Sequence, residues 1–343
     1  MRQPSLTSPT RYIHLLCRYV EQEGLDCSAV LAEFELDRQT LAHPETQLAP
    51  VRALGLFRAL ASKVACSELG LMLGKTVNFG ALGDVGRAML SSATTHEALL
   101  CCADFYPLVS PSFTVQVKQS AAHLELCWLP LRPVPYDFMC LAFDMTLSAV
   151  DTLLTTLEGD HMRGYDVYFT SPPPTHAGLY GRLTKARCHF DVPGMPCLRI
   201  HLDHDLLKTP SPLHSPAELA ILRKRLTQRL SQMPIPGSWT AWVSMMLKEA
   251  HCQQPSMDML ASIVQVSSST LSRHLAAEGT SFRELGNQIR HSKARGWLED
   301  GQLSVSEIAE RLGYANLPSF VRAFKAQSGC SPTQYARANA PSP

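Results

Sequence analysis

The segment Ser304–Arg337 reads SVSEIAERLGYANLPSFVRAFKAQSGCSPTQYAR and predicts two short helices joined by a tight turn. Ser304 or Ser306 can cap the first helix, because a serine hydroxyl accepts a hydrogen bond from an unpaired N–H of the first turn. Three residues at helical spacing form its apolar face: Ile308, Ala309 and Leu312. Ala309 is small enough for a second helix to cross closely, and Gly313 supplies the left-handed or tight turn that a helix-turn-helix needs.

The second helix of this unit has its own start signals. Asn316 can cap it, and Pro318 fits the first turn, where the N–H that proline lacks would have no partner. Phe320 and Phe324 are four residues apart, so both face the first helix. Ser331-Pro332 repeats the cap-then-proline start for a last helix.

An internal repeat precedes this unit. Residues 260–282 read LASIVQVSSSTLSRHLAAEGTSF, with Ala261 where the second unit has Ala309. Leu271-x-Arg273 likewise stands where the second unit has Phe320-x-Arg322. The distance from the alanine to the apolar anchor is ten residues in the first unit and eleven in the second. The repeat therefore predicts a second helix-turn-helix.

One long helix is predicted between the two units, over residues 281–300 (SFRELGNQIRHSKARGWLED). Ser281 and Glu284 have the spacing of a capping box at its start. Its expected buried side consists of Phe282, Leu285, Ile289, Ala294 and Leu298. The C-terminal part of the chain is thus predicted as an all-α domain, with two helix-turn-helix units joined by a long helix.

The N-terminal part of the chain mixes helical and strand patterns. Amphipathic helices are expected at 12–23, 50–64, 83–91 and 95–106, and a long apolar helix is expected around 138–157. Alternating strand patterns occupy 113–118, 123–128, 165–170, 186–190 and 198–203, and the first two are predicted to form a hairpin. These patterns predict an α+β domain.

Two proline clusters predict the domain boundaries, TPSPLHSP (209–216) and MPIPGS (233–238). We expect an N-terminal domain over 10–208, a linker with an amphipathic helix over 209–237, and a double helix-turn-helix domain over 238–338. The linker helix has a stripe of leucines at Leu219, Leu222, Leu226 and Leu230. This stripe either packs on its own domain or forms a short self-association seam.

Composition excludes several classes of protein. The chain of 343 residues has a formal net charge of +1 and contains no run of eighteen uncharged apolar residues. Its N-terminus lacks the apolar stretch of a signal peptide, so we expect a cytoplasmic protein without membrane contact. Eleven cysteines without C-x-x-C pairs indicate free thiols. His201 and His204 have a metal-like spacing, but we interpret them as a surface pair at the end of a strand, so no metal site is expected.

The stretch GLMLGKT (70–76) resembles a phosphate-binding loop only superficially. A P-loop has four residues between its two glycines, whereas Gly70 and Gly74 enclose three. A helical pattern rather than a buried strand precedes the stretch, and we interpret it as a helix that ends at a glycine. No nucleotide cofactor is therefore expected, nor any other cofactor.

Three segments carry a resemblance to a known family. IAERLGYANLPSFVRAFKAQSGCSPTQY (308–335) resembles the signature of the AraC/XylS family of transcriptional regulators, and STLSRHLAAEGTSFREL (269–285) resembles the first unit of that family. Residues 68–113 are similar to the arabinose-binding-like N-terminal effector and dimerisation domain of one branch of the family, a likeness that covers about 25–205. The similarity to that branch implies that the glycines of residues 70–76 lie at helix ends and turns.

The resemblance implies which residues read DNA. They are Ser269, Ser272 and Arg273 in the first unit, and Leu317, Pro318, Ser319 and Arg322 in the second. An arginine fork matches O6 and N7 of guanine, but each arginine could equally contact a phosphate. Leu317 is a candidate for contact with a thymine methyl group.

The first unit departs from the family pattern. Gln265 replaces the usual turn glycine, and its reading helix carries serines where larger polar or basic residues are common. Residues 238–343 hold ten Lys or Arg against eight Asp or Glu, which is only mildly basic. Shape, water and phosphate contacts are therefore the expected means of recognition for this unit.

The predicted function is a sequence-specific transcriptional regulator, an activator that responds to a small-molecule effector of unknown class. The implied partners are double-stranded promoter DNA, RNA polymerase and a second copy of the chain. Two alternatives stay open: a regulator without a ligand, and an enzyme with an appended DNA-binding domain. Against the enzyme, none of four carboxylates has a His or Cys at catalytic spacing: Asp84, Asp104, Asp137 and Asp144.

Overall fold

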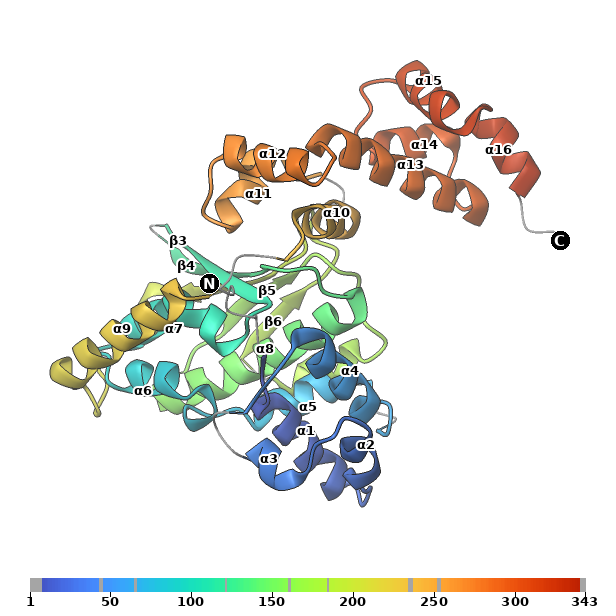
Figure 1. Ribbon diagram of the computed structural model, residues 1–343. Helices are drawn as coiled ribbons and strands as arrows, with labels where there is room; N and C mark the ends of the chain where they lie inside the picture. The colour runs from blue at the N-terminus through green and yellow to red at the C-terminus, as the bar shows by residue number, and fades with distance from the viewer. Residues whose placement is uncertain are drawn as a thin grey trace. The chain divides into compact units, whose positions relative to one another are not determined.

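The computed structural model describes residues 8–42, 46–64, 67–120, 122–159, 162–183, 185–233, 237–251 and 254–339 (Figure 1). The chain divides into two compact units. The first comprises Met1–Phe190 and Cys197–Gly237, and the second comprises Asp191–Pro196 and Ser238–Pro343.

A five-stranded sheet lies at the centre of the first unit. Its strands are β3 (Phe113–Gln119), β4 (His123–Pro130), β5 (Tyr165–Phe169), β6 (Ala186–His189) and β7 (Leu198–Asp203). They are ordered β3-β4-β7-β5-β6, and all neighbours are antiparallel except β5 and β6, which are parallel. Every predicted strand forms, and β3 and β4 make the predicted hairpin, with Phe113 opposite Pro130.

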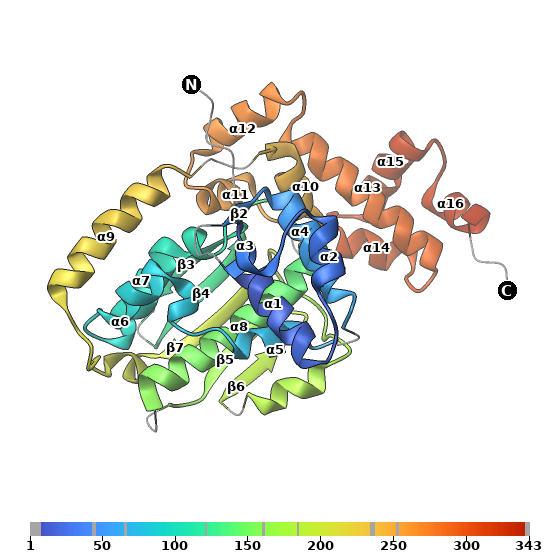
Figure 2. The ribbon, with the colours of Figure 1, turned by 60° about the horizontal axis from the view of Figure 1, so that its bottom comes forward.

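Most of the other elements of the first unit are α-helices (Figures 1 and 2). They are α1 (Arg11–Gln22), α2 (Ser28–Glu33), α3 (Arg38–Ala42), α4 (Pro50–Ala61), α5 (Leu69–Lys75), α6 (Asp84–Leu90), α7 (Thr95–Val109), α8 (Tyr136–Glu158) and α9 (Pro216–Ser231). Two short strands, β1 (Ser8–Pro9) and β2 (Gln47–Leu48), pair with each other, and 3-10 turns occupy Gly80–Leu82, Ala177–Arg182 and His204–Lys208. The expected end of α7 at residue 106 was wrong, since the helix continues through Pro107 to Val109.

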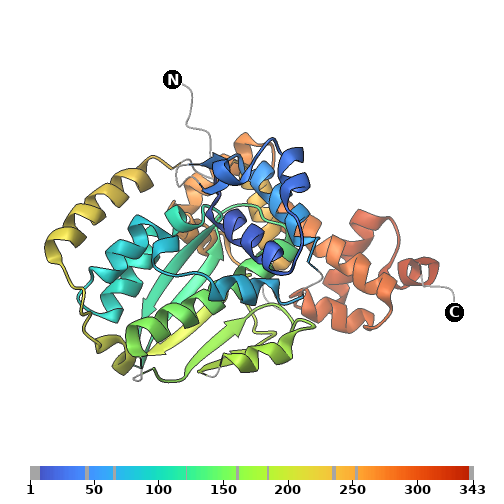
Figure 3. The same ribbon diagram turned by 90° about the horizontal axis from the view of Figure 1, so that it is seen from below.

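The main core of this unit lies between the sheet and α8 (Figure 3). Alternate strand residues such as Leu126, Val167 and Ile200 point to the same side and pack with Phe143 and Leu147 of α8. Among the described residues, α8 is the helix long and apolar enough to span a membrane by length and composition. Its apolar side chains are used in this core.

The glycines of the GLMLGKT stretch lie inside α5, where that helix crosses α8. A Cβ on Gly70 would lie 2.6 Å from the Leu141 carbonyl oxygen, and one on Gly74 would lie 2.4 Å from the Met145 carbonyl oxygen. Gly70 and Gly74 are the second and sixth residues of α5, near its ends as expected, and they also permit two helix backbones to approach closely. Lys75 is exposed at the end of a helix, whereas a P-loop lysine begins one.

Helix α9 packs on α6 and α7 (Figures 2 and 3). Leu219, Leu222 and Leu226 are 7%, 2% and 0% exposed and Leu230 is half-buried, so the leucine stripe packs mainly within its own unit. Backbone hydrogen bonds join the preceding proline-rich segment to the α6–α7 connection, for example from the Ser211 N–H to the Ala93 carbonyl. In the second proline cluster, 234–236 lie outside the described residues.

The second unit is all-α. Its helices are α10 (Trp239–Glu249), α11 (Met257–Ile263), α12 (Ser268–Ala277), α13 (Phe282–Asp300), α14 (Val305–Arg311), α15 (Leu317–Ser328) and α16 (Pro332–Asn339). The pairs α11–α12 and α14–α15 are the two predicted helix-turn-helix units, and α13 is the long helix between them (Figure 1). On α13, Leu285, Ala294 and Leu298 are buried as expected, whereas Phe282 and Ile289 are only half-buried. The predicted fold class is confirmed.

Candidate DNA-binding surface and ligand cavity

The first helix-turn-helix turns at Gln265, which has a left-handed backbone with φ of 55°. Two hydrogen bonds close the turn: the Gln265 N–H donates to the Ser262 carbonyl at 3.3 Å, and the Val266 N–H donates to the Ala261 carbonyl at 3.1 Å. This pattern is the usual way for a helix to end in a left-handed residue. Replacement of the turn glycine by glutamine therefore leaves the turn itself in place.

The second helix-turn-helix turns at Gly313 in the same way. Gly313 has φ of 75°, its N–H donates to the Glu310 carbonyl at 2.8 Å, and the Tyr314 N–H donates to the Ala309 carbonyl at 3.0 Å. The next helix is capped by Asn316, three residues after the left-handed glycine, whereas Ser267 follows Gln265 by two. This extra residue accounts for the different alanine-to-anchor distances.

Capping side chains set the starts of the helices. The Ser304 hydroxyl accepts from the Glu307 N–H, and the Glu307 carboxylate accepts from the Ser304 N–H at 2.8 Å, which completes a capping box. Ser281 caps α13 as predicted, with a bond of 3.2 Å from the Glu284 N–H. The expected second half of that box was wrong, because the Glu284 carboxylate accepts from the Thr280 hydroxyl.

The apolar anchors of both units are buried. Leu271 and Leu275 of α12 are 0% exposed, and Phe320 and Phe324 of α15 are 2% exposed. The two phenylalanines pack with each other and with α13 residues such as Leu298. Since these anchors fix one face of each second helix toward the core, the opposite face is left to solvent.

The residues expected to read DNA lie on these outer faces. Six of them are exposed: Ser269, Ser272 and Arg273 on α12, and Leu317, Pro318 and Arg322 on α15. Ser319 is half-buried, and its N–H is taken by the Asn316 cap at 2.9 Å. The Arg273 guanidinium bonds the Thr270 hydroxyl at 3.3 Å, one turn back on the same helix. The structure thus gathers each group on one helix surface, and contact with bases stays a prediction.

A carboxylate that the sequence patterns did not single out connects the first reading helix to α10. Glu278, at the end of α12, accepts hydrogen bonds from the Trp239 N–H at 2.9 Å, the Thr240 N–H at 2.8 Å and the Ser238 hydroxyl at 3.2 Å. Desolvation opposes ionisation of Glu278, but these bonds outweigh it and lower the pKa of the carboxyl. Glu278 therefore helps to hold α12 in position. This role is visible only in the folded structure, where Glu278 lies next to the start of α10.

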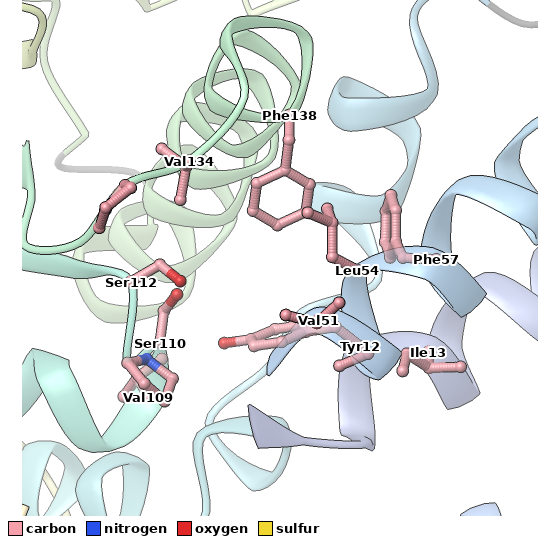
Figure 4. A pocket seen from close by; sticks show the side chains of 13 residues that line it. Tyr12, Ile13, Val51, Leu54, Phe57, Val109, Ser110, Ser112, Val134 and Phe138 are labelled. Carbon is pink, nitrogen blue, oxygen red and sulfur yellow. The ribbon is translucent and has the colours of Figure 1, made fainter. Parts of the chain in front are cut away.

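The first unit contains a cavity of about 180 Å³ (Figure 4). It lies between α1, α4, the start of α8 and the connections that flank β3 and β4. Its lining consists of Tyr12, Ile13, Val51, Ala53, Leu54, Phe57, Val109, Ser110, Pro111, Ser112, Pro133, Val134 and Phe138. None of these side chains is charged. The hydroxyls of Tyr12, Ser110 and Ser112 gather on one side, facing apolar side chains on the other (Figure 4).

The carboxylates considered for catalysis have structural partners. Three form ion pairs at the surface: Asp84 with Arg225 and Arg229, Asp104 with Arg223, and Asp137 with Arg58. Asp144 is buried, where it accepts from the Tyr180 hydroxyl and lies 3.0 Å from Nε2 of His176. Burial raises the pKa of Asp144 against the opposite effect of both neighbours. Sequence patterns did not predict this Asp–His pair. Both side chains are only 8% exposed, so the pair is enclosed within the first unit.

The chain matches two protein-family models. Residues 24–211 match the arabinose-binding domain of AraC transcription regulators, and residues 260–338 match a helix-turn-helix domain. The chain belongs to the AraC family of transcription regulators.

Similar proteins extend over nearly the whole chain. The Ornithine utilization regulator of Pseudomonas aeruginosa is 24% identical over 332 residues, 96% of each chain. The regulator VirS of Mycobacterium tuberculosis is 23% identical over 285 residues, 82% of each. The crystal structure of the transcriptional regulator CdpR from Pseudomonas aeruginosa, 20% identical, covers 95% of this chain and 98% of its own, with a TM-score of 0.47.

These AraC-family matches decide the broad function. The matching domains and relatives are transcription regulators, not enzymes, so the protein is a DNA-binding transcriptional regulator. The buried position of Asp144 and His176 agrees with this, because a catalytic pair must be reachable by substrate.

In the described part of the chain, no three His, Cys, Asp or Glu side chains are grouped to hold a metal. His201 bonds Glu125 at 2.9 Å and His204 bonds the Ser120 carbonyl at 2.7 Å.

Proposed function

We propose that the protein binds promoter DNA through both helix-turn-helix units and that a small-molecule effector in the first unit controls this binding. The observation that carries the proposal is the pair of reading helices, α12 and α15, each with one face buried in the second unit and the other exposed. A helix of this kind fits the major groove, where base edges are distinguishable. The cavity in the first unit supports the effector part of the proposal.

The domain roles follow the same division. Residues 10–208 bind the effector and pair two subunits, 209–237 connect the units, and 238–338 bind DNA. Because the leucines of α9 are covered within the first unit, pairing uses another surface of that unit. The protein acts in the cytoplasm, as an activator that contacts RNA polymerase.

Ornithine is not the effector that the cavity favours. The name of the Ornithine utilization regulator raises this compound as a candidate. Ornithine carries three charges at neutral pH, and no charged side chain lines the cavity to compensate them. Placing an uncompensated charge in such surroundings costs several kcal/mol or more.

In the second unit, Arg322 is the residue most suited to direct reading of a base. Its side chain is exposed on α15, and a guanidinium can bond O6 and N7 of guanine together. Arg273 has the matching position on α12, but its side chain also bonds Thr270. Removal of a bidentate contact costs about 1–3 kcal/mol at the base that it reads.

The test uses duplexes that the full-length protein selects from a random pool. We expect Arg322→Ala to weaken binding of the selected duplexes and to relax the preference at one base pair. The matched variant Arg322→Lys keeps the charge but loses the fork, so it should not restore that preference. Equal weakening on all sequences, with rescue by lysine, would instead identify Arg322 as a phosphate contact. Failure of the protein to enrich any duplex would contradict sequence-specific binding.

A further inference from the structure

The cavity of the first unit has the size of a small ring compound. A dry apolar cavity of about 150 Å³ in a protein accommodates benzene. The cavity here, at about 180 Å³, has room for one ring and a small substituent. Larger compounds, such as nucleotides, exceed this volume.

Most of the cavity wall is apolar. Leu54 and Phe57 of α4 and Phe138 of α8 supply one side of it (Figure 4), whereas Val51 of α4 is 85% exposed, so the cavity is open to solvent there. An apolar ring gains free energy by leaving water for such a wall, roughly in proportion to the area that it buries. A carboxylate or ammonium group would lose its hydration without gaining an ion-pair partner from the lining. The wall therefore selects against charged compounds.

Two serine hydroxyls are in place to bind one polar group. The backbone holds them, since the Ser110 N–H donates to the Tyr106 carbonyl at 2.9 Å and the Leu131 N–H donates to the Ser112 carbonyl at 2.8 Å. Within the part of the chain that the structure describes, neither Oγ atom has a hydrogen-bond partner. The Tyr12 hydroxyl points toward the same side (Figure 4). Hydroxyls both donate and accept, so they suit an alcohol or a carbonyl group.

We propose that this cavity binds an uncharged molecule the size of a single ring that carries one hydroxyl or carbonyl group. The polar group bonds Ser110 and Ser112, and the ring lies against Leu54, Phe57 and Phe138. The proposal rests on the effector-controlled function given above and specifies the chemical class of the effector.

Four probes of nearly equal size test the proposal by calorimetry on the full-length protein: benzyl alcohol, toluene, benzoate and benzylamine. We expect benzyl alcohol to bind with one molecule per chain and to bind at least about tenfold more tightly than the two charged probes. The double variant Ser110→Ala/Ser112→Ala should weaken benzyl alcohol about two- to tenfold, the effect of a lost hydrogen bond, and leave toluene unchanged. Thr156→Ala, which removes an exposed hydroxyl of α8 outside the cavity, is the matched control and should alter neither.

A second variant, Leu54→Trp, fills the cavity and should abolish binding of benzyl alcohol and toluene while the circular dichroism spectrum stays native. Charged probes that bind as tightly as benzyl alcohol, or absence of saturable benzyl alcohol binding, would overturn the proposal. So would an unchanged benzyl alcohol affinity in the serine double variant. Saturable binding without any change in DNA affinity would support the cavity assignment and contradict effector control. If another compound changed DNA affinity and benzyl alcohol did not bind, effector control would be supported and the cavity assignment would be contradicted.

Discussion

The turns of the two helix-turn-helix units form a matched pair for substitution. Both have a left-handed residue closed by the same two hydrogen bonds, but this residue is Gln265 in the first unit and Gly313 in the second. We predict opposite effects from opposite exchanges. Gly313→Ala and Gly313→Val should destabilise the second unit, whereas Gln265→Gly should leave it equally stable or stabilise it.

The magnitude follows from the surroundings of Gly313. A Cβ added there would meet no atom within 4 Å, so a steric clash contributes nothing to the cost. What is left is the left-handed backbone, which costs an ordinary L-residue about 1–2 kcal/mol. Alanine should therefore lower stability by about 1 kcal/mol, and branched valine by about 2 kcal/mol. At Gln265 the relief of this strain is offset by the greater freedom of glycine in the unfolded chain, about 0.5–1 kcal/mol, so the net gain is at most about 1.5 kcal/mol.

Tryptophan fluorescence during urea unfolding of the full-length protein measures these changes. Of the four tryptophans, Trp239, Trp242 and Trp297 lie in the second unit and Trp128 lies in the first, so the signal mainly reports on the second unit. In thermal unfolding, a change of about 1 kcal/mol should move the midpoint by about 4–8 °C for a domain of this size. A Gly313→Val protein as stable as the parent would refute the reasoning. So would a loss of more than about 1 kcal/mol in Gln265→Gly, because glycine fits the observed φ at least as well as glutamine.

Three further predictions concern contacts elsewhere in the two units. Glu278→Gln should lower the free energy of urea unfolding at pH 7 by an amount typical of a lost helix cap, about 1 kcal/mol. Because the folded-state pKa of Glu278 is lowered, this difference is present above the unfolded pKa and should vanish as the pH falls through the folded pKa. Gly74→Ala puts a methyl group 2.4 Å from the Met145 carbonyl oxygen, so calorimetry should show the first unit destabilised by about 1–3 kcal/mol. The control Lys75→Ala, at the exposed end of the same helix, should change the stability of the first unit little. Leu222→Glu buries a carboxylate among apolar side chains of α6 and α7, so limited proteolysis should show a loosened first unit; an intact fold with altered subunit pairing would contradict the burial of α9.

Much of the second unit could be predicted because its signals are local. A cap, a turn residue and an apolar pair define each helix-turn-helix within about 25 residues, and the repeat provides the pattern twice. The departure at Gln265 did not alter the fold, because the same two backbone hydrogen bonds close the turn with glutamine at this position as with glycine at Gly313. The half-formed box at Ser281 shows the limit of such signals: spacing allows Glu284 to reach back, but the Thr280 hydroxyl competes for the same carboxylate.

The features that sequence patterns missed depend on segments far apart in the chain. The spacing of Gly70 and Gly74 is visible in the sequence, but its purpose depends on α8, about seventy residues later, whose backbone would contact any added Cβ. Asp144 meets His176 across 32 residues for the same reason. The cavity draws its wall from α1, α4, α8 and two loops, so no single segment contains the pattern of apolar and hydroxyl groups. Local sequence thus specified the DNA-binding unit, whereas the ligand site became visible only when the helices of the first unit were packed around the sheet.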